Sequence, residues 1–164
     1  MGRRGIHGRH FAERVHAQCL DTNVYIDFLG RRPPFFESAC KVVAAGFFGD
    51  AKLWLPAHSA NDAFYVLSRY QKAETVQRAM LESFEVISPV APSPEDILRT
   101  ARLNWPDYED CLISLCADKA QADYLITRDP HGFERATVPA FFPLEWLALM
   151  ECEHGFTYDS ASLT

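Results

Sequence analysis

Short apolar segments of strand-like composition alternate along the chain with longer segments of helical periodicity. The predicted strands are residues 17–20, 52–55, 84–87, 124–127 and 139–142. Helix-length connections favour a parallel sheet, because a parallel strand pair needs a long crossover whereas an antiparallel pair needs only a turn. The alternation therefore predicts an α/β fold with three α/β/α layers and a mainly parallel central sheet.

The clearest predicted helix begins near Asp107 and carries a single apolar stripe. The stripe consists of Tyr108, Cys111, Leu112, Leu115 and Cys116. Residues at this spacing fall on one helical face, so we expect the stripe to be buried and Asp110 to lie off it, toward the ends of the strands. The other predicted helices are residues 24–29, 35–48, 59–70, 74–83, 94–103 and 144–150.

The length of 164 residues and the apolar fraction of 48% fit one compact domain with a single core. We assign residues 17–152 to this domain, residues 1–16 to a flexible N-terminal extension and residues 153–164 to a polar C-terminal tail. The sequence contains no run of about 18 apolar residues, so no membrane-spanning helix is expected.

The net charge of −6 argues against a protein that binds nucleic acid by bulk electrostatics alone. The first 18 residues carry a local excess of positive charge, so the rest of the chain is more acidic still. The five cysteines are odd in number and include no C-x-x-C pair, which argues against a disulfide framework and a zinc ribbon. A cytoplasmic location is therefore expected, with Cys19, Cys111 and Cys116 as buried apolar residues.

Aspartates stand where predicted strands end and where predicted helices begin. Asp21 follows the first strand, Asp129 lies just beyond the strand 124–127, and Asp62 and Asp110 lie near helix starts. Binding sites of parallel sheets form at the carboxyl ends of the strands, so the four carboxylates are expected to converge there. Carboxylates this close repel one another and raise each other's pKa unless a cation lies among them. A site made only of oxygen ligands favours Mg²⁺ or Mn²⁺.

Each aspartate also has a purely structural interpretation. The S-x-x-D motif at 59–62 and the D-x-x-D motif at 107–110 fit helix capping boxes. Asp21 fits a turn or cap, and Asp129 precedes a proline, which is common in turns. Capping does not exclude metal binding, because a carboxylate has several acceptor positions. The hypothesis of a metal site therefore depends on the four aspartates together.

Other α/β chemistries lack their characteristic residues. The chain contains no G-x-G-x-x-G, no G-x-x-x-x-G-K-[ST] and no G-x-S-x-G motif, so neither dinucleotide binding, a P-loop nor a nucleophile elbow is supported. Phosphatases with an aspartyl nucleophile usually carry a second acid two residues after the first. Asn23 occupies that position here, which argues against this class.

Four motifs resemble those of the PIN-domain family, metal-dependent ribonucleases that include the VapC-type toxins. The motifs are LDTNV at 20–24, PAHSANDAFYVL at 56–67, DYEDCL at 107–112 and ADYLITRD at 122–129. The resemblance covers about residues 17–150 and implies a PIN-like fold. It assigns the family's catalytic acids to Asp21, Asp62, Asp110 and Asp129. The second acid of the family is more often glutamate, so Asp62 is one methylene shorter than usual.

The resemblance implies a ribonuclease in which Asp21, Asp110 and Asp129 hold Mg²⁺ or Mn²⁺. It also implies that the metal ligands are positioned by residues that do not bind the metal themselves, namely Thr22, Asn23, Asp107 and Thr127. Glu109 adds negative charge nearby. RNA would be the substrate, an antitoxin protein a partner, and a homodimer the expected assembly. The alternative is a catalytically weak or inactive PIN-like domain that binds RNA or protein, which the shorter Asp62 and the acidic surface leave open.

Residues that contact RNA are harder to identify from the sequence. Arg31, Arg32 and Arg128 are the candidates for phosphate contacts, with Lys119 and Arg135 as further ones. Isolated arginines of this kind are more often solvated than bound. Trp105 is a candidate for stacking on a base, although packing against the start of the neighbouring helix is the more common role of such a residue.

Overall fold

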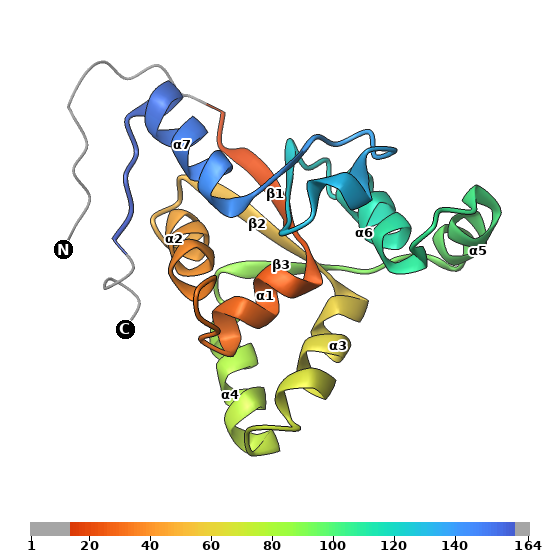
Figure 1. Ribbon diagram of the computed structural model, residues 1–164, viewed down its shortest axis with the longest axis horizontal. Helices are drawn as coiled ribbons and strands as arrows, with labels where there is room; N and C mark the ends of the chain where they lie inside the picture. Colours follow the sequence, from red (N-terminus) through yellow and green to blue (C-terminus); the bar gives the residue numbers. More distant parts are fainter. Residues whose placement is uncertain (1–13, 160–164) are drawn as a thin grey trace.

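The computed structural model describes residues 14–159 and shows a five-stranded sheet covered by helices (Figure 1). The strand order is β3-β2-β1-β4-β5, and every neighbouring pair is parallel, as the alternating pattern predicts. The strands are β1 (His16–Leu20), β2 (Ala51–Pro56), β3 (Ile87–Val90), β4 (Tyr124–Ile126) and β5 (Ala140–Phe141). The predicted three-layer α/β/α fold is confirmed, and β1 lies in the middle of the sheet.

Helices pack on both faces of the sheet, and neighbouring residues of one strand face different helices. Leu20 of β1 and Ile126 of β4 belong to the larger apolar cluster, with side chains of α1, α2, α3, α4 and α7. Their neighbours Cys19 and Leu125 face a smaller cluster with α6 and the short 3-10 helix η1. The helices are α1 (Thr22–Leu29), α2 (Phe36–Phe47), α3 (Ala57–Leu67), α4 (Ala73–Ser83), α5 (Pro94–Leu103), α6 (Tyr108–Lys119), η1 (Pro130–Phe133) and α7 (Pro143–His154).

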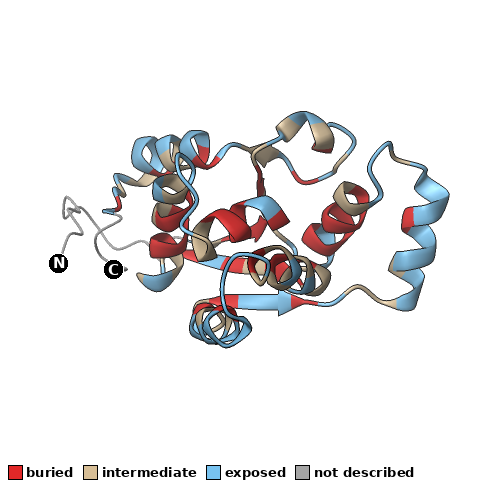
Figure 2. Ribbon diagram, turned by 60° about the horizontal axis from the view of Figure 1, so that its bottom comes forward, coloured by how far each residue is buried: buried red, intermediate tan, exposed pale blue. Residues whose placement is uncertain are grey.

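Helix α6 is buried on more sides than its apolar stripe predicts. Cys111, Leu112, Leu115 and Cys116 are buried as expected, but so are the residues between them. Helix α5 packs against α6 (Figure 1). The prediction is wrong for Tyr108, which is 47% exposed because its hydroxyl reaches out to donate a hydrogen bond to a carbonyl of α5. In Figure 2, which is coloured by burial, the buried segments lie toward the centre of the molecule and the exposed segments lie around them.

The predicted start of the third strand is wrong. Strand β3 begins at Ile87 rather than at residue 84, because the turn after α4 takes up the intervening residues. Pro89 lies inside β3, which an edge strand tolerates because one of its sides needs no backbone donors. Near the C-terminal end of the described residues, Tyr158 is buried and stacks on Phe48.

The N-terminal extension predicted for residues 1–16 lies mostly outside the described residues. Within residues 14–159, no helix has both the length and the apolar character needed to cross a membrane. Cys19, Cys111 and Cys116 are buried free thiols, as expected.

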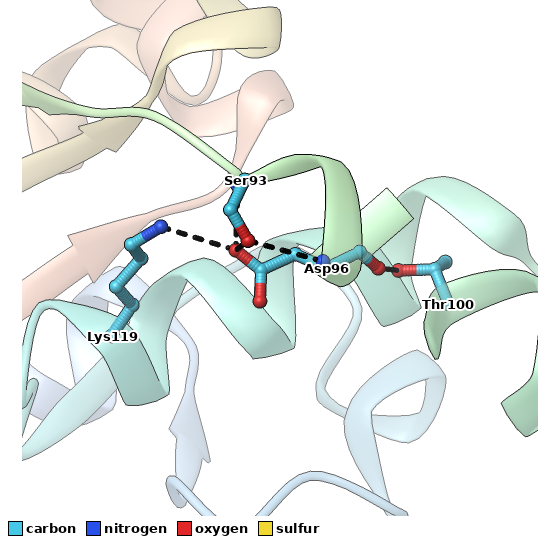
Figure 3. Close-up of polar contacts among 4 residues, drawn as sticks. All are labelled: Ser93, Asp96, Thr100 and Lys119. Atoms are coloured by element: carbon cyan, nitrogen blue, oxygen red, sulfur yellow. Dashed lines mark hydrogen bonds and ion pairs between the residues drawn. The ribbon is translucent and has the colours of Figure 1, made fainter. Parts of the chain in front are cut away.

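We expect Ser93→Ala to lower the free energy of unfolding by about 1 kcal/mol, because it removes the cap of α5. The Ser93 hydroxyl accepts the backbone N–H of Asp96, and the Asp96 carboxylate accepts the backbone N–H of Ser93. The same carboxylate accepts a bond from Lys119 of α6 at 3.1 Å, which joins the two helices (Figure 3). Urea unfolding measures the loss. Ser88→Ala, on the exposed side of β3, is the control, and an equal loss in both variants would contradict the capping role.

Candidate active site

Asp21 occupies the position directly after the central strand β1, where α1 begins. The residue is 5% exposed, and its Oδ2 accepts a hydrogen bond from the Thr127 hydroxyl at 2.8 Å. Burial raises the pKa of Asp21 to about 6, with a further increase from the charge of Glu109. Thr127 and the backbone of Thr22 and Asn23 act in the opposite direction, because they favour the ionised carboxylate. Burial outweighs them, so the fold holds Asp21 in place at an electrostatic cost.

Thr127 connects two of the predicted metal ligands. It follows β4 and is fully buried. Its hydroxyl donates to Asp21 and accepts the backbone N–H of Asp129 at 3.0 Å. A single hydroxyl therefore sets the position of the Asp129 backbone relative to the Asp21 carboxylate. Asp129 itself is exposed at the start of η1.

Asp110 lies in the first turn of α6, but it does not cap that helix. Asp107 is the cap, and its Oδ1 accepts the backbone N–H groups of Glu109 and Asp110 at 2.8 and 3.1 Å. The Asp110 carboxylate instead faces Gly132: a Cβ built on this glycine would lie 2.5 Å from Asp110 Oδ2 and 3.5 Å from Asp129 Oδ2. The two carboxylates therefore flank the same backbone position.

The electrostatics of Asp110 show how crowded this part of the molecule is. The pKa of Asp110 rises to about 7, first because of burial and then because of four neighbouring acids. These acids are Asp107, Asp21, Glu109 and Asp129, in decreasing order of effect. Two of the other predicted catalytic acids, Asp21 and Asp129, thus act on Asp110 near the carboxyl ends of β1 and β4.

A hydroxyl pair joins the helices that carry the acids. Thr22 Oγ1 lies 2.7 Å from Ser59 Oγ on α3 and 2.6 Å from Glu109 Oε1 on α6. Ser59 is fully buried inside α3, which begins at Ala57 and has no side-chain cap. The capping interpretation of the 59–62 motif is therefore wrong, because the Ser59 hydroxyl bonds to α1 instead. Thr22 supports Glu109 through its side chain and Asp21 only through its backbone.

Asp62 lies on the His58 side of the cluster. The charges of Glu109 and Asp62 both act on His58, whose pKa burial nevertheless lowers. Both ring nitrogens of His58 are buried and without a hydrogen-bond partner. The acids that act on Asp110 do not include Asp62. Glu109 acts on both His58 and Asp110, and His58 is a neighbour that the sequence did not reveal as part of the site.

The acidic cluster suits a hard divalent cation in its donor chemistry. Its members offer carboxylate oxygens, and the pKa values of Asp21 and Asp110 are raised first by burial and then by neighbouring acids, whose repulsion a cation would relieve. Among residues 14–159, no three Asp, Glu, His or Cys side chains already stand at a spacing that holds one metal ion. Sharing one ion would therefore require side-chain rotation, for which exposed Asp129 and half-buried Asp110 have more room than buried Asp21.

The basic residues proposed for RNA contact differ in how freely they face solvent. Arg31 is exposed, whereas Arg128 is half-buried, with Nε 3.1 Å from Asp27 Oδ2 and its guanidinium 4.3 Å from the centre of the Phe35 ring. Arg32 is exposed and lies 3.9 Å from the other Asp27 oxygen. No sequence pattern indicates this partnership, because Asp27 precedes Arg128 by about a hundred residues.

The two further cations, Lys119 and Arg135, have structural partners. Lys119 bonds to Asp96 of α5. Arg135 donates to the carbonyls of Leu103 and Asn104 and lies over the Trp105 ring. Trp105 packs against the smaller apolar cluster, as its structural interpretation predicts. These residues hold the loop between α5 and α6 in place.

Sequence comparison agrees with the fold and with the position of the acids. Residues 18–131 match the sequence profile of the PIN domain, and the matched segment includes all four predicted catalytic aspartates. The chain belongs to the PIN-domain family. A search of curated proteins gave no match.

Solved structures with the same fold share little sequence with this chain. VapBC2 from Rickettsia felis, bound to a promoter DNA fragment, has a TM-score of 0.59 at 15% identity over 77% of this chain and 98% of the other. VapBC-1 from nontypeable Haemophilus influenzae gives 0.59 at 19% identity, covering 78% and 98%. FitAB bound to a DNA fragment gives 0.55 at 19% identity, covering 77% and 94%. Similarity at this level of identity concerns the fold alone.

Proposed function

We propose that the protein is a metal-dependent ribonuclease that hydrolyses RNA phosphodiester bonds and acts as the toxin of a toxin–antitoxin pair. The observation that carries the proposal is the gathering of Asp21, Asp110 and Asp129 at the carboxyl ends of β1 and β4. After burial, repulsion from neighbouring acids that include Asp21 and Asp129 contributes to raising the pKa of Asp110 to about 7. Repulsion of this kind destabilises the folded protein unless a cation binds among the carboxylates, and a bound cation would in turn attract an anionic substrate.

The surroundings of Asp21, Asp110 and Asp129 give these three residues different proposed roles. Asp21 is the fixed ligand, because Thr127 and burial hold its carboxylate. Asp110 and Asp129 are the adaptable ligands on either side of Gly132. Bound Mg²⁺ or Mn²⁺ would polarise the scissile phosphate and activate a water molecule. Asp129, the most exposed of the three, is suited to accept a hydrogen bond from the attacking water.

An antitoxin protein partner, a homodimer and a cytoplasmic location belong to the same proposal. The names VapBC2, VapBC-1 and FitAB denote two-component assemblies, and their shared fold with this chain supports a protein partner. Five free cysteines suit a reducing compartment.

The second candidate is a weakly active or inactive PIN domain that binds RNA or protein. The observation that favours it is the position of Asp62, whose charge acts on His58 and is not among those that raise the pKa of Asp110. If the fourth acid contributes little, the metal site has only three strong ligands. This candidate predicts RNA binding or partner binding without cleavage.

Cleavage of a mixed RNA pool with Mg²⁺, with Mn²⁺ and with EDTA separates the two candidates. We expect cleavage with either ion and none with EDTA. Asp129→Asn should reduce the rate at least about a hundredfold, a loss of the size that follows removal of a group stabilising the transition state. Glu82→Gln, which removes a charge from the exposed face of α4, should leave the rate unchanged. Equal rates in EDTA and Mg²⁺, or full activity of Asp129→Asn, would contradict a metal-dependent site.

A further inference from the structure

The carboxylate of Glu109 is oriented by two buried hydroxyl groups that belong to other helices. Glu109 Oε1 lies 2.6 Å from Thr22 Oγ1, which in turn lies 2.7 Å from Ser59 Oγ. A hydroxyl carries one proton and an ionised carboxylate can only accept, so Thr22 donates to Glu109 and accepts from Ser59. Because Thr22 belongs to α1, Ser59 to α3 and Glu109 to α6, three helices meet at this one carboxylate.

The second oxygen of Glu109 is available to a ligand. Within residues 14–159, no group donates a hydrogen bond to Oε2, and this oxygen is not buried. The backbone N–H of Glu109 is bonded to Asp107 Oδ1 at 2.8 Å, so the main chain is fixed as well. A carboxylate held through one oxygen and open at the other can bind a ligand with little further loss of conformational freedom.

Glu109 and Asp110 approach the acidic cluster from different directions. Consecutive side chains of an α-helix point about 100° apart. Asp110 faces η1, whereas Glu109 faces Thr22, the residue that follows Asp21. The charge of Glu109 acts on both Asp21 and Asp110. Glu109 therefore adds a carboxylate to the cluster from the side of α1 and α3.

Asp62, the acid that the family resemblance assigns to the site from α3, is less well placed. Within the described residues, its carboxylate takes part in no hydrogen bond or ion pair. Its charge acts on His58 and is not among the charges that raise the pKa of Asp21 or Asp110. Glu109 is one methylene longer, is held by a hydrogen bond, and acts on both of these aspartates.

We propose that Glu109 is the fourth acid of the site and binds the divalent cation through Oε2, in the place that the resemblance gives to Asp62. The proposal rests on the ribonuclease function above and names a further ligand of the same site. A carboxylate oxygen suits Mg²⁺ or Mn²⁺, which prefer hard oxygen ligands. Thr22 and Ser59 are positioning residues, because they act on the cation only through Glu109.

Titration of the protein with Mn²⁺ in the absence of RNA, followed by calorimetry, tests the proposal without catalysis. We expect Glu109→Gln to weaken Mn²⁺ binding at least about tenfold. Glu109→Asp should weaken it to a similar extent, because the shorter side chain cannot both keep the bond to Thr22 and present its other oxygen to the cation. This variant keeps the negative charge, so its loss of affinity cannot be attributed to a weaker electric field.

Substitutions of Thr22 test the positioning role. Thr22→Val removes the hydroxyl and keeps the shape of the side chain, so we expect Mn²⁺ binding to weaken about tenfold. Thr22→Ser keeps the hydroxyl and should retain wild-type affinity. If the Thr22–Glu109 bond only joins α1 to α6, Thr22→Val will melt lower than the wild type at unchanged Mn²⁺ affinity, which would overturn the proposal.

Asp62→Asn is the matched control for the loss of a charge near the cluster. The charges of Asp62 and Glu109 both act on His58, so each substitution removes one negative charge from this neighbourhood. We expect Asp62→Asn to weaken Mn²⁺ binding less than about threefold, because a charge that does not touch the cation acts through screening solvent. Glu82→Gln, on the exposed face of α4, should leave the affinity unchanged.

The outcomes separate the role of Glu109 from the proposed ribonuclease activity. Wild-type Mn²⁺ affinity in Glu109→Asp, or a larger loss in Asp62→Asn than in Glu109→Gln, would overturn the role of Glu109, while metal-dependent RNA cleavage by the wild type would still stand. Weaker Mn²⁺ binding in both Glu109 variants, together with a wild type that cuts no RNA, would support the ligand and contradict the ribonuclease. A wild type that binds no Mn²⁺ would contradict both.

Discussion

Replacing Asp110 by asparagine is expected to abolish RNA cleavage and to leave the metal-free protein as stable as the wild type or more stable. A neutral amide at this position cannot supply a charged metal ligand, so the site loses one of its three proposed carboxylates. In the absence of metal, the substitution also removes one of the like charges that crowd Asp21, Glu109 and Asp129. The variant should therefore lose RNA cleavage while keeping or gaining metal-free stability, a combination that general damage to the fold would not produce.

The expected gain in stability follows from the sizes of the competing terms. A fully shielded carboxyl whose pKa rises from 3.8 to about 7 would be destabilised by about 4 kcal/mol at high pH. Because Asp110 is half-buried, solvent screening reduces this to about 1–2 kcal/mol. The lost attraction to the start of α6 is about 0.3–1 kcal/mol. We therefore expect a melting temperature between unchanged and about 4 °C higher in EDTA.

The pH dependence of the free energy of unfolding tests the sign of the stability effect of Asp110→Asn independently. Asp110 has a higher pKa in the folded protein than in the unfolded chain, and so has Asp21, at about 6. The stability associated with these groups is full below their unfolded pKa and is lost as the pH rises through the folded values. In EDTA, the wild type should therefore lose stability between about pH 4 and pH 8. Asp110→Asn should lose less over this range.

Thermal melts of wild type and variant, each in EDTA and in millimolar Mg²⁺, measure the whole prediction. Mg²⁺ should raise the melting temperature of the wild type by mass action and that of Asp110→Asn much less. Glu82→Gln controls for the loss of one negative charge elsewhere. A variant that melts lower than wild type by the same amount in both buffers would show that Asp110 stabilises the helix start and holds no metal.

The order of strands and helices was predictable because it depends on local patterns. Apolar runs of strand length and helical stripes repeat at their own periods regardless of the distant chain, so most elements were found close to their observed bounds. The carboxyl ends of parallel strands meet at one edge, which is why Asp21 and Asp129 were expected together. Thr127 was assigned a supporting role by its motif, and its bond to Asp21 gives that role a physical basis.

Features that depend on contacts between distant segments were not predictable. Ser59 has the spacing of a cap, yet its hydroxyl bonds to Thr22, 37 residues away. The stripe on α6 suggested one buried face, but α5, η1 and the strands all pack against this helix. Arg128 was a candidate for phosphate contact, and only the fold brings it to Asp27. Local periodicity contains no information about such partners.

Gly132→Ala is expected to reduce cleavage at least about tenfold while changing the melting temperature by no more than about 4 °C. An alanine Cβ at this position would lie 2.5 Å from Asp110 Oδ2, which is closer than atoms of this kind approach in folded proteins. The obstructing atom is the end of a flexible side chain, so Asp110 can rotate away at small cost in stability. The added methyl group then restricts the rotations by which Asp110 could turn toward a metal ion shared with Asp129, which is costly for catalysis.

Gly46→Ala is expected to have the opposite effect, a loss of stability with no loss of specific activity. A Cβ there would lie 2.6 Å from Leu53 Cδ1 and 2.9 Å from Val86 Cγ1, inside the apolar core. Overpacking of a core typically costs about 1–3 kcal/mol, so this variant should melt clearly lower and keep its specific activity when folded. If the Asp110 carboxylate takes part in cleavage, the two glycine variants must separate activity from stability in opposite directions. Full activity of Gly132→Ala would mean that the position of Asp110 relative to Asp129 does not matter for catalysis.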